Sequence, residues 1–330
     1  MINASSPAKD AGSVNYLEAM TMQLATGIGR LPDAVRASHA TYFVAAQQSD
    51  GGFAGREAGS DLYYTSFALR GLAISGTLYG SCAEHAADFL RQQFQKQLPV
   101  VDFLALLYSQ KLLQAAAGIE VLQDAAPAWR DRVVAFLDTC RRADGGYARG
   151  PENPRSSTYH TFLILICLEL LEAPPADPEA TVRFLKSQQR EDGGFVEFAP
   201  MRRSGTNPTA AAVGGLKMLG QLSPELATAT ADFLVGMQAP EGGLRANTRI
   251  PVADLLSSFT GLFTLFDLGE HQRLQLELLT QFAGQLAKGD GGFCGALWDT
   301  DSDVEYTFYG LGTLALLATS GHTYDFQTAS

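Results

Sequence analysis

The hydrophobic pattern of the chain consists of helical runs joined by polar loops. Between positions 14 and 28 apolar residues recur at helical spacing and predict a leading helix, with Tyr16, Met20, Met22 and Leu24 on it. Beyond this helix the runs come in pairs. In the first pair a helix ending FVAAQQ at 43–48 is followed, after a loop, by the strongly apolar helix SFALRGLAI at 66–74. The pattern therefore predicts an all-α chain built from helix pairs.

A glycine turn recurs within the helix pairs. Its copies are Asp50-Gly51-Gly52-Phe53, Asp144-Gly145-Gly146-Tyr147, Asp192-Gly193-Gly194-Phe195, Glu241-Gly242-Gly243-Leu244 and Asp290-Gly291-Gly292-Phe293. The first spacing is 144−50 = 94, and the later ones are 192−144 = 48, 241−192 = 49 and 290−241 = 49. The first gap is therefore two periods and contains a degenerate unit, in which positions 96–99 replace the glycine turn. Self-similarity at a fixed period is typical of repeat folds.

The repeats predict a single domain over 1–330 with about twelve helices and with residues 1–13 flexible. The helix pairs are expected near 34–75, 84–117, 128–173, 179–220, 224–268 and 274–318. A closed ring is favoured over an open solenoid, because no unit has the polar face of a capping repeat. Glycines recur in the inner helices, where each costs up to ~1 kcal/mol relative to alanine, so we expect close helix packing there.

Composition and charge narrow the possible partners and locations. The chain has 330 residues, 46% of them hydrophobic and 18% charged, and a net charge of −11, which argues against nucleic acid and anionic membrane surfaces. No apolar stretch approaches the ~20 residues of a membrane span, and no secretory signal is visible, so we expect a cytoplasmic protein that is not integral to a membrane. The four cysteines form no CxxC pair, and Cys167 is expected to be a buried free thiol.

The repeat resembles that of the protein prenyltransferase β-subunit and squalene cyclase family. The pattern Q-x-x-D-G-G-F, a loop, D-x-x-Y-T and an apolar helix is carried by 47–65, 140–161, 188–209, 238–258 and 290–307. The resemblance implies an α/α toroid with six inner and six outer helices around an apolar cavity that holds an isoprenoid or a prenyl diphosphate. In length and repeat pattern the chain is similar to the Rab geranylgeranyltransferase β subunit. Family β subunits pair with a helical-repeat subunit, so a partner subunit and a homodimer both remain open.

The zinc ligands of the family's cysteine-alkylating members are not matched. Those members use an Asp-x-Cys pair in the fifth repeat and a histidine in the sixth. Asp254 fits the aspartate, but Leu256 stands at the cysteine position and Tyr306 at the histidine position. Leucine has no atom that can bind a metal. Since two of the three ligands that the resemblance implies are replaced, we expect no zinc. We keep Asp254 as a candidate substrate-binding residue.

The diphosphate ligands that the resemblance implies are also replaced. The matching positions hold Thr206, Thr248, Pro251 and Ser257. Arg249 lies in the same loop and is a candidate replacement, and Arg202, before the fourth inner helix, is a second candidate for attracting an anion. Tyr64 and His160, each directly before the repeat threonine, are further candidate substrate-binding residues. For His160 the alternative is a capping or hydrogen-bonding histidine, for Tyr64 it is a packing residue, and for Arg202 it is an exposed surface residue.

The sixth repeat contains an acidic ladder, formed by Asp299, Asp301, Asp303 and Glu305. It has three alternative interpretations. Cyclases of the family protonate an alkene with the middle aspartate of D-x-D-D-T, and on that pattern Glu305 is the acid, with Asp303 and Tyr306 beside it as candidate catalytic residues. A raised pKa is required for this role. Asp299, Asp301 and Asp303 also suit a Mg2+ site, since hard cations prefer clustered carboxylates. The third interpretation is a solvated loop and helix cap.

Two functions are therefore compared. The first is an isoprenoid-processing toroid enzyme that acts without zinc on a prenyl diphosphate or polyprenyl substrate, by acid-initiated cyclisation or by prenyl transfer. It predicts an apolar cavity with Glu305, Asp303, Tyr306 and His160 facing inward. The alternative is a non-catalytic isoprenoid-binding or assembly module that has lost the site.

Overall fold

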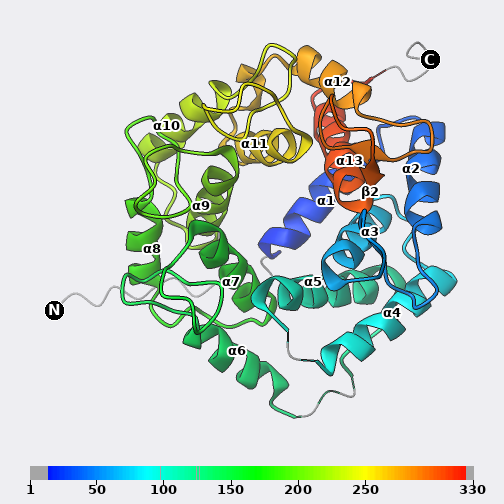
Figure 1. The fold of residues 1–330 in the computed structure, drawn as a ribbon, viewed down its shortest axis with the longest axis horizontal. Coiled ribbons are helices and arrows are strands. Elements are labelled where there is room, and N and C mark those ends of the chain that lie inside the picture. The colour runs from blue at the N-terminus through cyan, green and yellow to red at the C-terminus, as the bar shows by residue number, and fades with distance from the viewer. Residues whose placement is uncertain (1–13, 97, 124, 126, 325–330) are drawn as a thin grey trace.

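The computed structural model describes residues 14–324 except 97, 124 and 126, so residues 1–13, expected to be flexible, lie outside the described part. The described chain alternates between an outer and an inner layer of helices (Figure 1). The outer helices are α2 (Asp33–Ala45), α4 (Gly80–Phe94), α6 (Trp129–Thr139), α8 (Pro178–Ser187), α10 (Pro224–Val235) and α12 (Leu276–Gln285). The inner helices are α3 (Leu62–Ile74), α5 (Val100–Ala117), α7 (Thr158–Leu170), α9 (Thr206–Met218), α11 (Leu255–Leu268) and α13 (Val304–Thr319).

The inner helices form a closed ring. Each contacts the next in chain order, and α13 contacts α3, so the last helix pair lies beside the first. Two short elements complete the architecture: a 3-10 turn, η1 (His271–Arg273), and an antiparallel pair of strands, β1 (Phe293–Cys294) and β2 (Ser302–Asp303). The all-α toroid predicted from the sequence is confirmed.

Each glycine turn packs against the outer helix of the following repeat. Gly51 has φ of 87°, a left-handed conformation that favours glycine, and a Cβ there would lie 2.1 Å from the carbonyl oxygen of His85 on α4. The sixth turn packs in the same way on the first repeat: a Cβ on Gly291, with φ of 91°, would lie 2.5 Å from the carbonyl oxygen of Ser38 on α2. The glycine turns therefore join neighbouring repeats at five of the six junctions of the outer layer, all except that between the second and third repeats.

The first position of the repeat motif caps four of the inner helices, through an aspartate in α3, α11 and α13 and through Ser157 in α7. Asp61 caps α3 by accepting a hydrogen bond from the backbone N–H of Tyr64, at 2.7 Å. The hydroxyl of Thr65, at the end of the motif, accepts a hydrogen bond from the backbone N–H of Phe53 at 2.9 Å and so braces the glycine turn. The equivalent bonds join Tyr147 to Thr161, Phe195 to Thr209, Leu244 to Ser258 and Phe293 to Thr307. We call this residue the brace.

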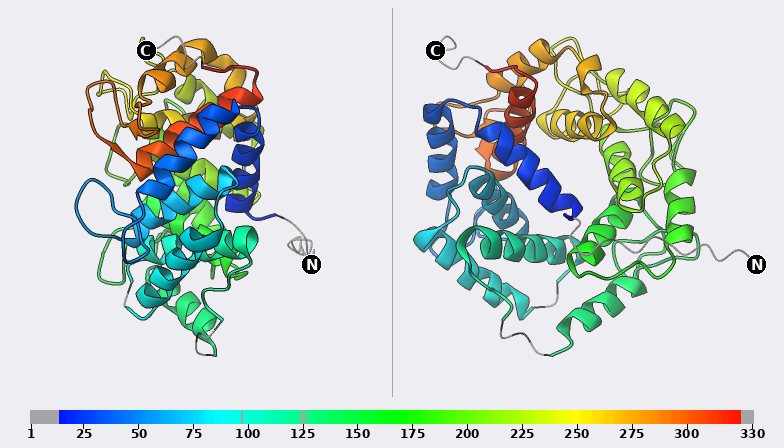
Figure 2. Two further views of the ribbon diagram at one scale, coloured as in Figure 1. Left: turned by 90° about the vertical axis from the view of Figure 1, so that its right-hand side faces the viewer. Right: turned by 180° about the vertical axis from the view of Figure 1, so that it is seen from behind.

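Helix α1 (Tyr16–Ile28) lies outside the pairs and crosses one end of the ring. It packs against α13 and α3, and the loops that lead into the inner helices gather at the opposite end (Figure 2). Contact with α13 is close, since a Cβ on Gly27 would lie 2.1 Å from the carbonyl oxygen of Ala315. We refer to the loop end as the rim and to α1 as the floor. No helix within the described ranges is long and apolar enough to cross a membrane.

Candidate functional site

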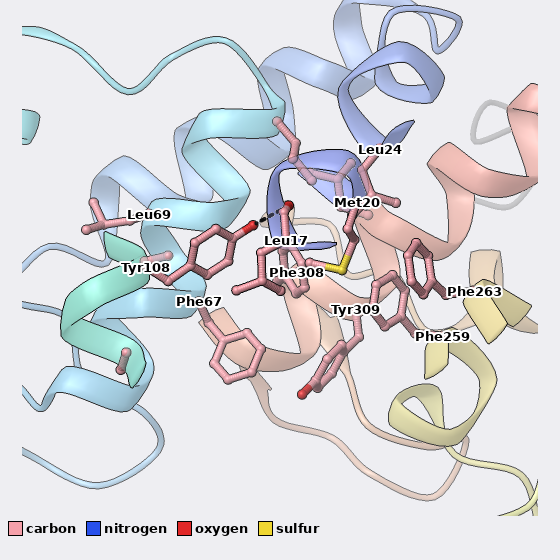
Figure 3. Packing of buried hydrophobic residues seen from close by; sticks show 14 of the residues in the cluster. Leu17, Met20, Leu24, Phe67, Leu69, Tyr108, Phe259, Phe263, Phe308 and Tyr309 are labelled. Carbon is pink, nitrogen blue, oxygen red and sulfur yellow. Dashed lines mark hydrogen bonds between the residues drawn. The ribbon is translucent and has the colours of Figure 1, made fainter. Parts of the chain in front are cut away.

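The ring encloses an apolar cavity of about 370 Å3. This volume lies in the range of small-molecule pockets, about 300–1,000 Å3. Six inner helices and the floor helix contribute to its wall, which is rich in aromatic side chains such as Phe67, Phe259, Phe263, Phe308 and Tyr309 (Figure 3). Aromatic faces can stabilise a positive charge. The central cavity expected from the sequence is therefore present.

The repeat register places the cavity side chains in three layers. The layer nearest the rim is formed by residues two positions before the brace, and Tyr63, Tyr159, Asn207 and Leu256 line the cavity there. The second layer, two positions after the brace, includes Phe67, Leu163, Ala211, Thr260 and Tyr309, and the third, five positions after it, includes Arg70, Ile166 and Phe263. Seven residues of helix separate the first layer from the third, which is about 10 Å along the axis.

Glu305 holds the equivalent of the first-layer position in the sixth repeat, but it is not among the residues that line the cavity. Its Oε1 accepts a hydrogen bond of 2.6 Å from the hydroxyl of Tyr63, whose ring lines the cavity. Burial raises the pKa of the Glu305 carboxyl; the Tyr63 hydrogen bond acts in the opposite sense, and the nearby Asp303 adds to the increase. The net effect is a raised pKa, which keeps the acid form populated to higher pH than in an exposed glutamate.

The N-terminal end of the floor helix α1 is hydrogen-bonded to inner helices of the ring. The backbone N–H of Tyr16 donates to Glu169 on α7 at 2.8 Å, and the Tyr16 hydroxyl donates to Asp267 on α11 at 3.4 Å. Lys217 on α9 forms an ion pair of 2.6 Å with the same aspartate. Further along α1, the carbonyl of Leu17 accepts a hydrogen bond from Tyr108 on α5 at 3.2 Å (Figure 3). These contacts hold α1 across the cavity.

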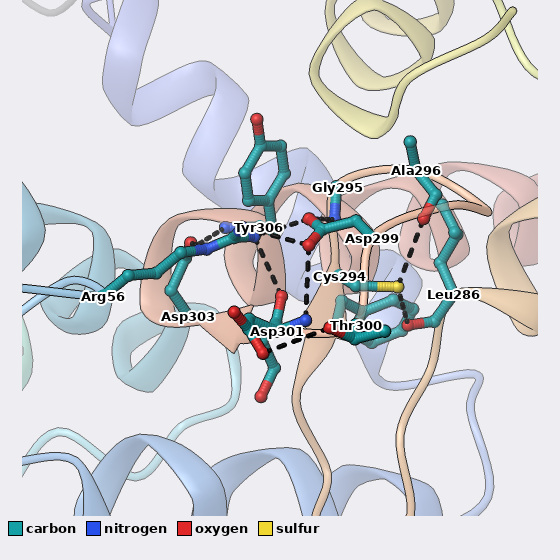
Figure 4. Close-up of polar contacts among 12 residues, drawn as sticks. Arg56, Leu286, Cys294, Gly295, Ala296, Asp299, Thr300, Asp301, Asp303 and Tyr306 are labelled. Atoms are coloured by element: carbon teal, nitrogen blue, oxygen red, sulfur yellow. Dashed lines mark hydrogen bonds and ion pairs between the residues drawn. The ribbon is translucent and has the colours of Figure 1, made fainter.

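An arginine of the first repeat, Arg56, binds to the acidic ladder of the sixth. Arg56 Nε lies 2.8 Å from Asp303 Oδ2, and its Nη2 lies 2.6 Å from Asp299 Oδ2 and 2.9 Å from the carbonyl oxygen of Asp301 (Figure 4). Burial acts to raise the pKa of Asp299, but the hydrogen bonds from Arg56 and from the backbone N–H groups of Gly295 and Asp301 together outweigh it and lower that pKa. The expected Mg2+ site at Asp299, Asp301 and Asp303 is therefore wrong: Arg56 already pairs with two of the three carboxylates, and the described residues include no group of three metal-binding side chains.

Three residues that we expect to face the cavity make contacts in the rim instead. They are Asp303, Tyr306 and His160. Asp303 caps α13 through the N–H of Tyr306, at 2.8 Å, and binds Arg56. The Tyr306 ring lies over Gly295, where a Cβ would be 2.7 Å from its Cζ. His160 Nδ1 lies 2.8 Å from the Ser157 hydroxyl, in agreement with the capping alternative. None of the three lines the cavity, and neither does Glu305, whose carboxyl is linked to the cavity wall by its hydrogen bond to Tyr63.

The other candidate substrate-binding residues also lie outside the cavity lining. Tyr64 covers Gly55 as Tyr306 covers Gly295, since a Cβ on Gly55 would lie 2.2 Å from the Tyr64 ring. Asp254 caps α11, where both of its carboxylate oxygens accept hydrogen bonds from Ser257, at 2.7 and 2.8 Å. Arg202 and Arg249 are exposed in rim loops.

The sequence interpretation missed Tyr63 and Arg70 as cavity residues. A signal was available: once the brace is recognised, the position two residues before it faces the cavity in four repeats, and Tyr63 occupies that position. Arg70 follows from the same register, because it lies on α3 where α7 has Ile166 and α11 has Phe263.

Comparison with known proteins supports the same architecture. The family model of the prenyltransferase alpha-alpha toroid domain matches residues 21–101, 83–213 and 209–329. Candida albicans protein geranylgeranyltransferase-I complexed with GGPP is similar at a TM-score of 0.70 and 18% identity, over 85% of this chain and 90% of that one. No curated protein sequence matches the chain.

Two further structures show how differently this fold is used. Type II terpene cyclase MstE from Scytonema, in a variant bound to geranylgeranyl dihydroxybenzoate, is similar at a TM-score of 0.57 and 14% identity, over 92% of this chain and 99% of that one. The GH76A alpha-1,6-mannanase from Salegentibacter sp. HEL1_6 is similar at a TM-score of 0.59 and 12% identity, over 87% and 98%. At these identities the likeness concerns the fold alone, and function has to be argued from the cavity.

Proposed function

The chain belongs to the prenyltransferase alpha-alpha toroid family, and on that premise we propose that its cavity binds an isoprenoid chain and that Glu305 protonates it. The observation that carries this proposal is a buried carboxyl with a raised pKa that is hydrogen-bonded to Tyr63 in the wall of an aromatic-lined cavity of about 370 Å3. Support for the ligand class comes from structural neighbours, which are bound to GGPP and to geranylgeranyl dihydroxybenzoate.

The proposed reaction is an isomerisation by cyclisation. The O–H bond of the Glu305 carboxyl breaks as its proton forms a C–H bond with one carbon of a double bond, which leaves a carboxylate and a tertiary carbocation. A second double bond supplies the electron pair for a new C–C bond, and the final cation loses a proton to solvent. Solvent then reprotonates Glu305, so that atoms and charge balance. The rings of Phe259, Phe308 and Tyr309 would stabilise the intermediate cation.

The proposal includes no zinc. The residues at the family's ligand positions do not fit this metal: Leu256 has no ligand atom, and Asp254 is engaged in capping α11. Tyr306 stacks under the Arg56 guanidinium, whose Cζ lies 5.3 Å from the ring centroid. Chemistry on a bound cysteine thiolate would need a different ligand set.

The proposal is tested by product analysis after incubation with isoprenoids of increasing length. Geranyl, farnesyl and geranylgeranyl diphosphate and the corresponding alcohols are each incubated with and without Mg2+, and products are separated by gas chromatography and mass spectrometry. We expect a cyclic product of unchanged mass from at least one of them. Tight binding without any product supports the alternative of a non-catalytic isoprenoid-binding module, and absence of binding overturns both.

Turnover is expected to fall as pH rises through the pKa of Glu305. The acid form is the reactive one, so activity is present below that pKa and lost above it, with the midpoint above the ordinary value of 4.5 because burial raises it. The Tyr63 hydroxyl stabilises the carboxylate and thus lowers this pKa. A Tyr63→Phe variant should therefore shift the midpoint of the pH–rate profile to higher pH. A shift to lower pH, or none, contradicts the assignment of the profile to Glu305.

A further inference from the structure

Exposed hydrophobic side chains gather in the rim loops. Eleven large hydrophobic side chains are exposed in the described part of the chain, and six of them lie in three consecutive rim loops, 196–205, 245–254 and 295–301. They are Phe198, Met201, Ile250, Val252, Leu297 and Trp298. Trp298 is the most exposed of the eleven, at 76%. Single exposed hydrophobic residues are ordinary on a protein surface, whereas their concentration at one end of the molecule indicates an interaction site.

Five exposed arginines lie in the same loops and in the neighbouring rim loop 148–157. They are Arg149, Arg155, Arg202, Arg203 and Arg249. None of their guanidinium groups forms an ion pair or a hydrogen bond with another described residue. By contrast, the arginines beside the glycine turns of the same repeats each donate hydrogen bonds to backbone carbonyl oxygens: Arg142, Arg190 and Arg245. The five loop arginines are therefore available to an anionic partner.

The charge of these loops is opposite in sign to that of the whole chain. Loops 148–157, 196–205 and 245–254 contain six arginines and three acids, which gives 6 − 3 = +3, whereas the chain carries −11. Loop 295–301 adds two acids, of which Asp299 is paired with Arg56 and Asp301 is exposed. Charges are screened over about 8 Å at physiological ionic strength, so acids on the outer helices do not cancel the loop arginines. The net charge of the chain therefore does not exclude an anionic surface as a partner of the rim.

Backbone hydrogen bonds join these loops into one surface. The first N–H of an inner helix donates to a carbonyl oxygen of the next loop three times in succession: Thr158 to Glu197 at 3.0 Å, Thr206 to Ala246 at 2.9 Å and Leu255 to Gly295 at 2.8 Å. The loops lie at the end of the ring where Tyr159 and Leu256 line the first layer of the cavity (Figure 2). We call the surface formed by loops 148–157, 196–205, 245–254 and 295–301 the docking face.

We propose that the docking face binds the surface of an anionic lipid bilayer, with its hydrophobic side chains inserted at the interface and its arginines on the phosphate groups of the lipids. Peripheral proteins bind such surfaces through buried apolar area together with the attraction of Lys and Arg to anionic lipids, and tryptophan is enriched at the interface. The six hydrophobic side chains come from separate loops, and none of them lines the cavity. This arrangement suits insertion into a fluid surface better than capture of a folded partner.

Membrane contact at this end of the ring also has a purpose for the cavity. This inference rests on the proposed isoprenoid-binding function in one respect: isoprenoid chains dissolve in bilayers, so the docking face would place the first layer of the cavity next to their source. The contact itself depends only on the rim side chains. It can therefore be measured without any isoprenoid.

Co-sedimentation of the full chain with lipid vesicles tests the proposal. We expect binding to vesicles of phosphatidylcholine and phosphatidylglycerol in equal parts, and binding at least about tenfold weaker to pure phosphatidylcholine. Removal of two charges in Arg202→Gln with Arg203→Gln should weaken binding to the anionic vesicles about tenfold to thirtyfold. Leu297→Ser with Trp298→Ser should weaken it at least about tenfold, because the inserted apolar area is lost.

Matched control variants carry the same changes away from the rim. Met22→Ser removes an exposed hydrophobic side chain from the floor helix, at the opposite end of the ring. Arg132→Gln with Arg183→Gln removes two exposed charges from the outer helices α6 and α8. Both controls should bind the anionic vesicles within a few-fold of the native chain. Equal losses in the rim and control variants overturn the docking face.

Trp298 also reports directly on the contact. The chain has two tryptophans, so Trp129→Phe leaves Trp298 as the single fluorophore. Because this side chain is 76% exposed, its emission should shift to shorter wavelength when anionic vesicles are added, and lipids with brominated chains should quench it. Vesicle binding without this shift places the contact elsewhere on the molecule and overturns the assignment.

The remaining outcomes separate the docking face from the proposed function. Absence of binding to anionic vesicles overturns the membrane proposal, and binding of polyglutamate in its place assigns the rim to an acidic protein partner. Geranylgeraniol is titrated calorimetrically into the chain without vesicles. Alcohol binding without vesicle binding refutes the docking face and leaves the proposed function intact. Vesicle binding without alcohol binding refutes the proposed function and supports the docking face.

Discussion

A Glu305→Gln variant is expected to lose at least about 100-fold of the turnover of the isoprenoid substrate, within the range of about 10²–10⁴ that a positioned acid contributes. The amide matches the carboxyl in shape and can still accept the hydrogen bond from Tyr63, 2.6 Å away in the native site, so the fold and the cavity should be unchanged. What the amide cannot do is release a proton to a double bond. The measurement is the initial rate of product formation at saturating substrate, together with substrate affinity by calorimetry.

Glu197→Gln provides the matched control for this result. Glu197 is also a rim glutamate whose pKa burial raises, but it accepts a hydrogen bond from the backbone N–H of Tyr159, at 3.3 Å, and not from the hydroxyl of Tyr63. Its conversion to glutamine should leave turnover within a few-fold of the native rate. Equal losses in both variants would point to a general disturbance of the rim, and full activity in Glu305→Gln would assign the proton to another group.

Gly291→Ala is expected to destabilise the protein by about 3 kcal/mol. The left-handed conformation, with φ of 91°, costs an alanine roughly 1–2 kcal/mol. The new methyl would also lie 2.5 Å from the carbonyl oxygen of Ser38, and relief of such a contact by backbone movement costs a further ~1–3 kcal/mol. Because this contact joins the sixth repeat to the first, the change weakens closure of the ring. Urea denaturation followed by circular dichroism measures the loss as a lower midpoint.

A control variant, Gly59→Ala, separates the stability cost of the left-handed backbone conformation from the cost of the steric contact. Gly59 also has a positive φ, 101°, but a Cβ there would have no atom within 4 Å. Gly59→Ala should therefore cost only the conformational part, about 1 kcal/mol. If the two variants lose equal stability, contact with α2 does not contribute, and the role assigned to the glycine turn in closing the ring is wrong.

The sequence by itself determined the helix pairs, their number and the ring. These depend on features that recur within one repeat: the turn acid, the two glycines and the brace, which bond to one another across about a dozen residues, as Thr65 does to Phe53. It also identified Glu305 as the candidate acid, through its place in the sixth motif. The zinc-ligand positions were readable in the same way, because Leu256 and Tyr306 occupy defined motif positions.

Only the tertiary structure decided the roles of charges that meet across the closed ring. Arg56 and Asp299 are 243 positions apart, and nothing local indicates that the arginine occupies the acidic ladder. Arg70 is similar: the repeat register places it in the cavity wall, but nothing local indicates that the rings of Tyr108 and Phe308 lie against its guanidinium. Local pattern fixes which residues start and brace a helix, whereas the electrostatic environment of a charge depends on which helices the ring brings together.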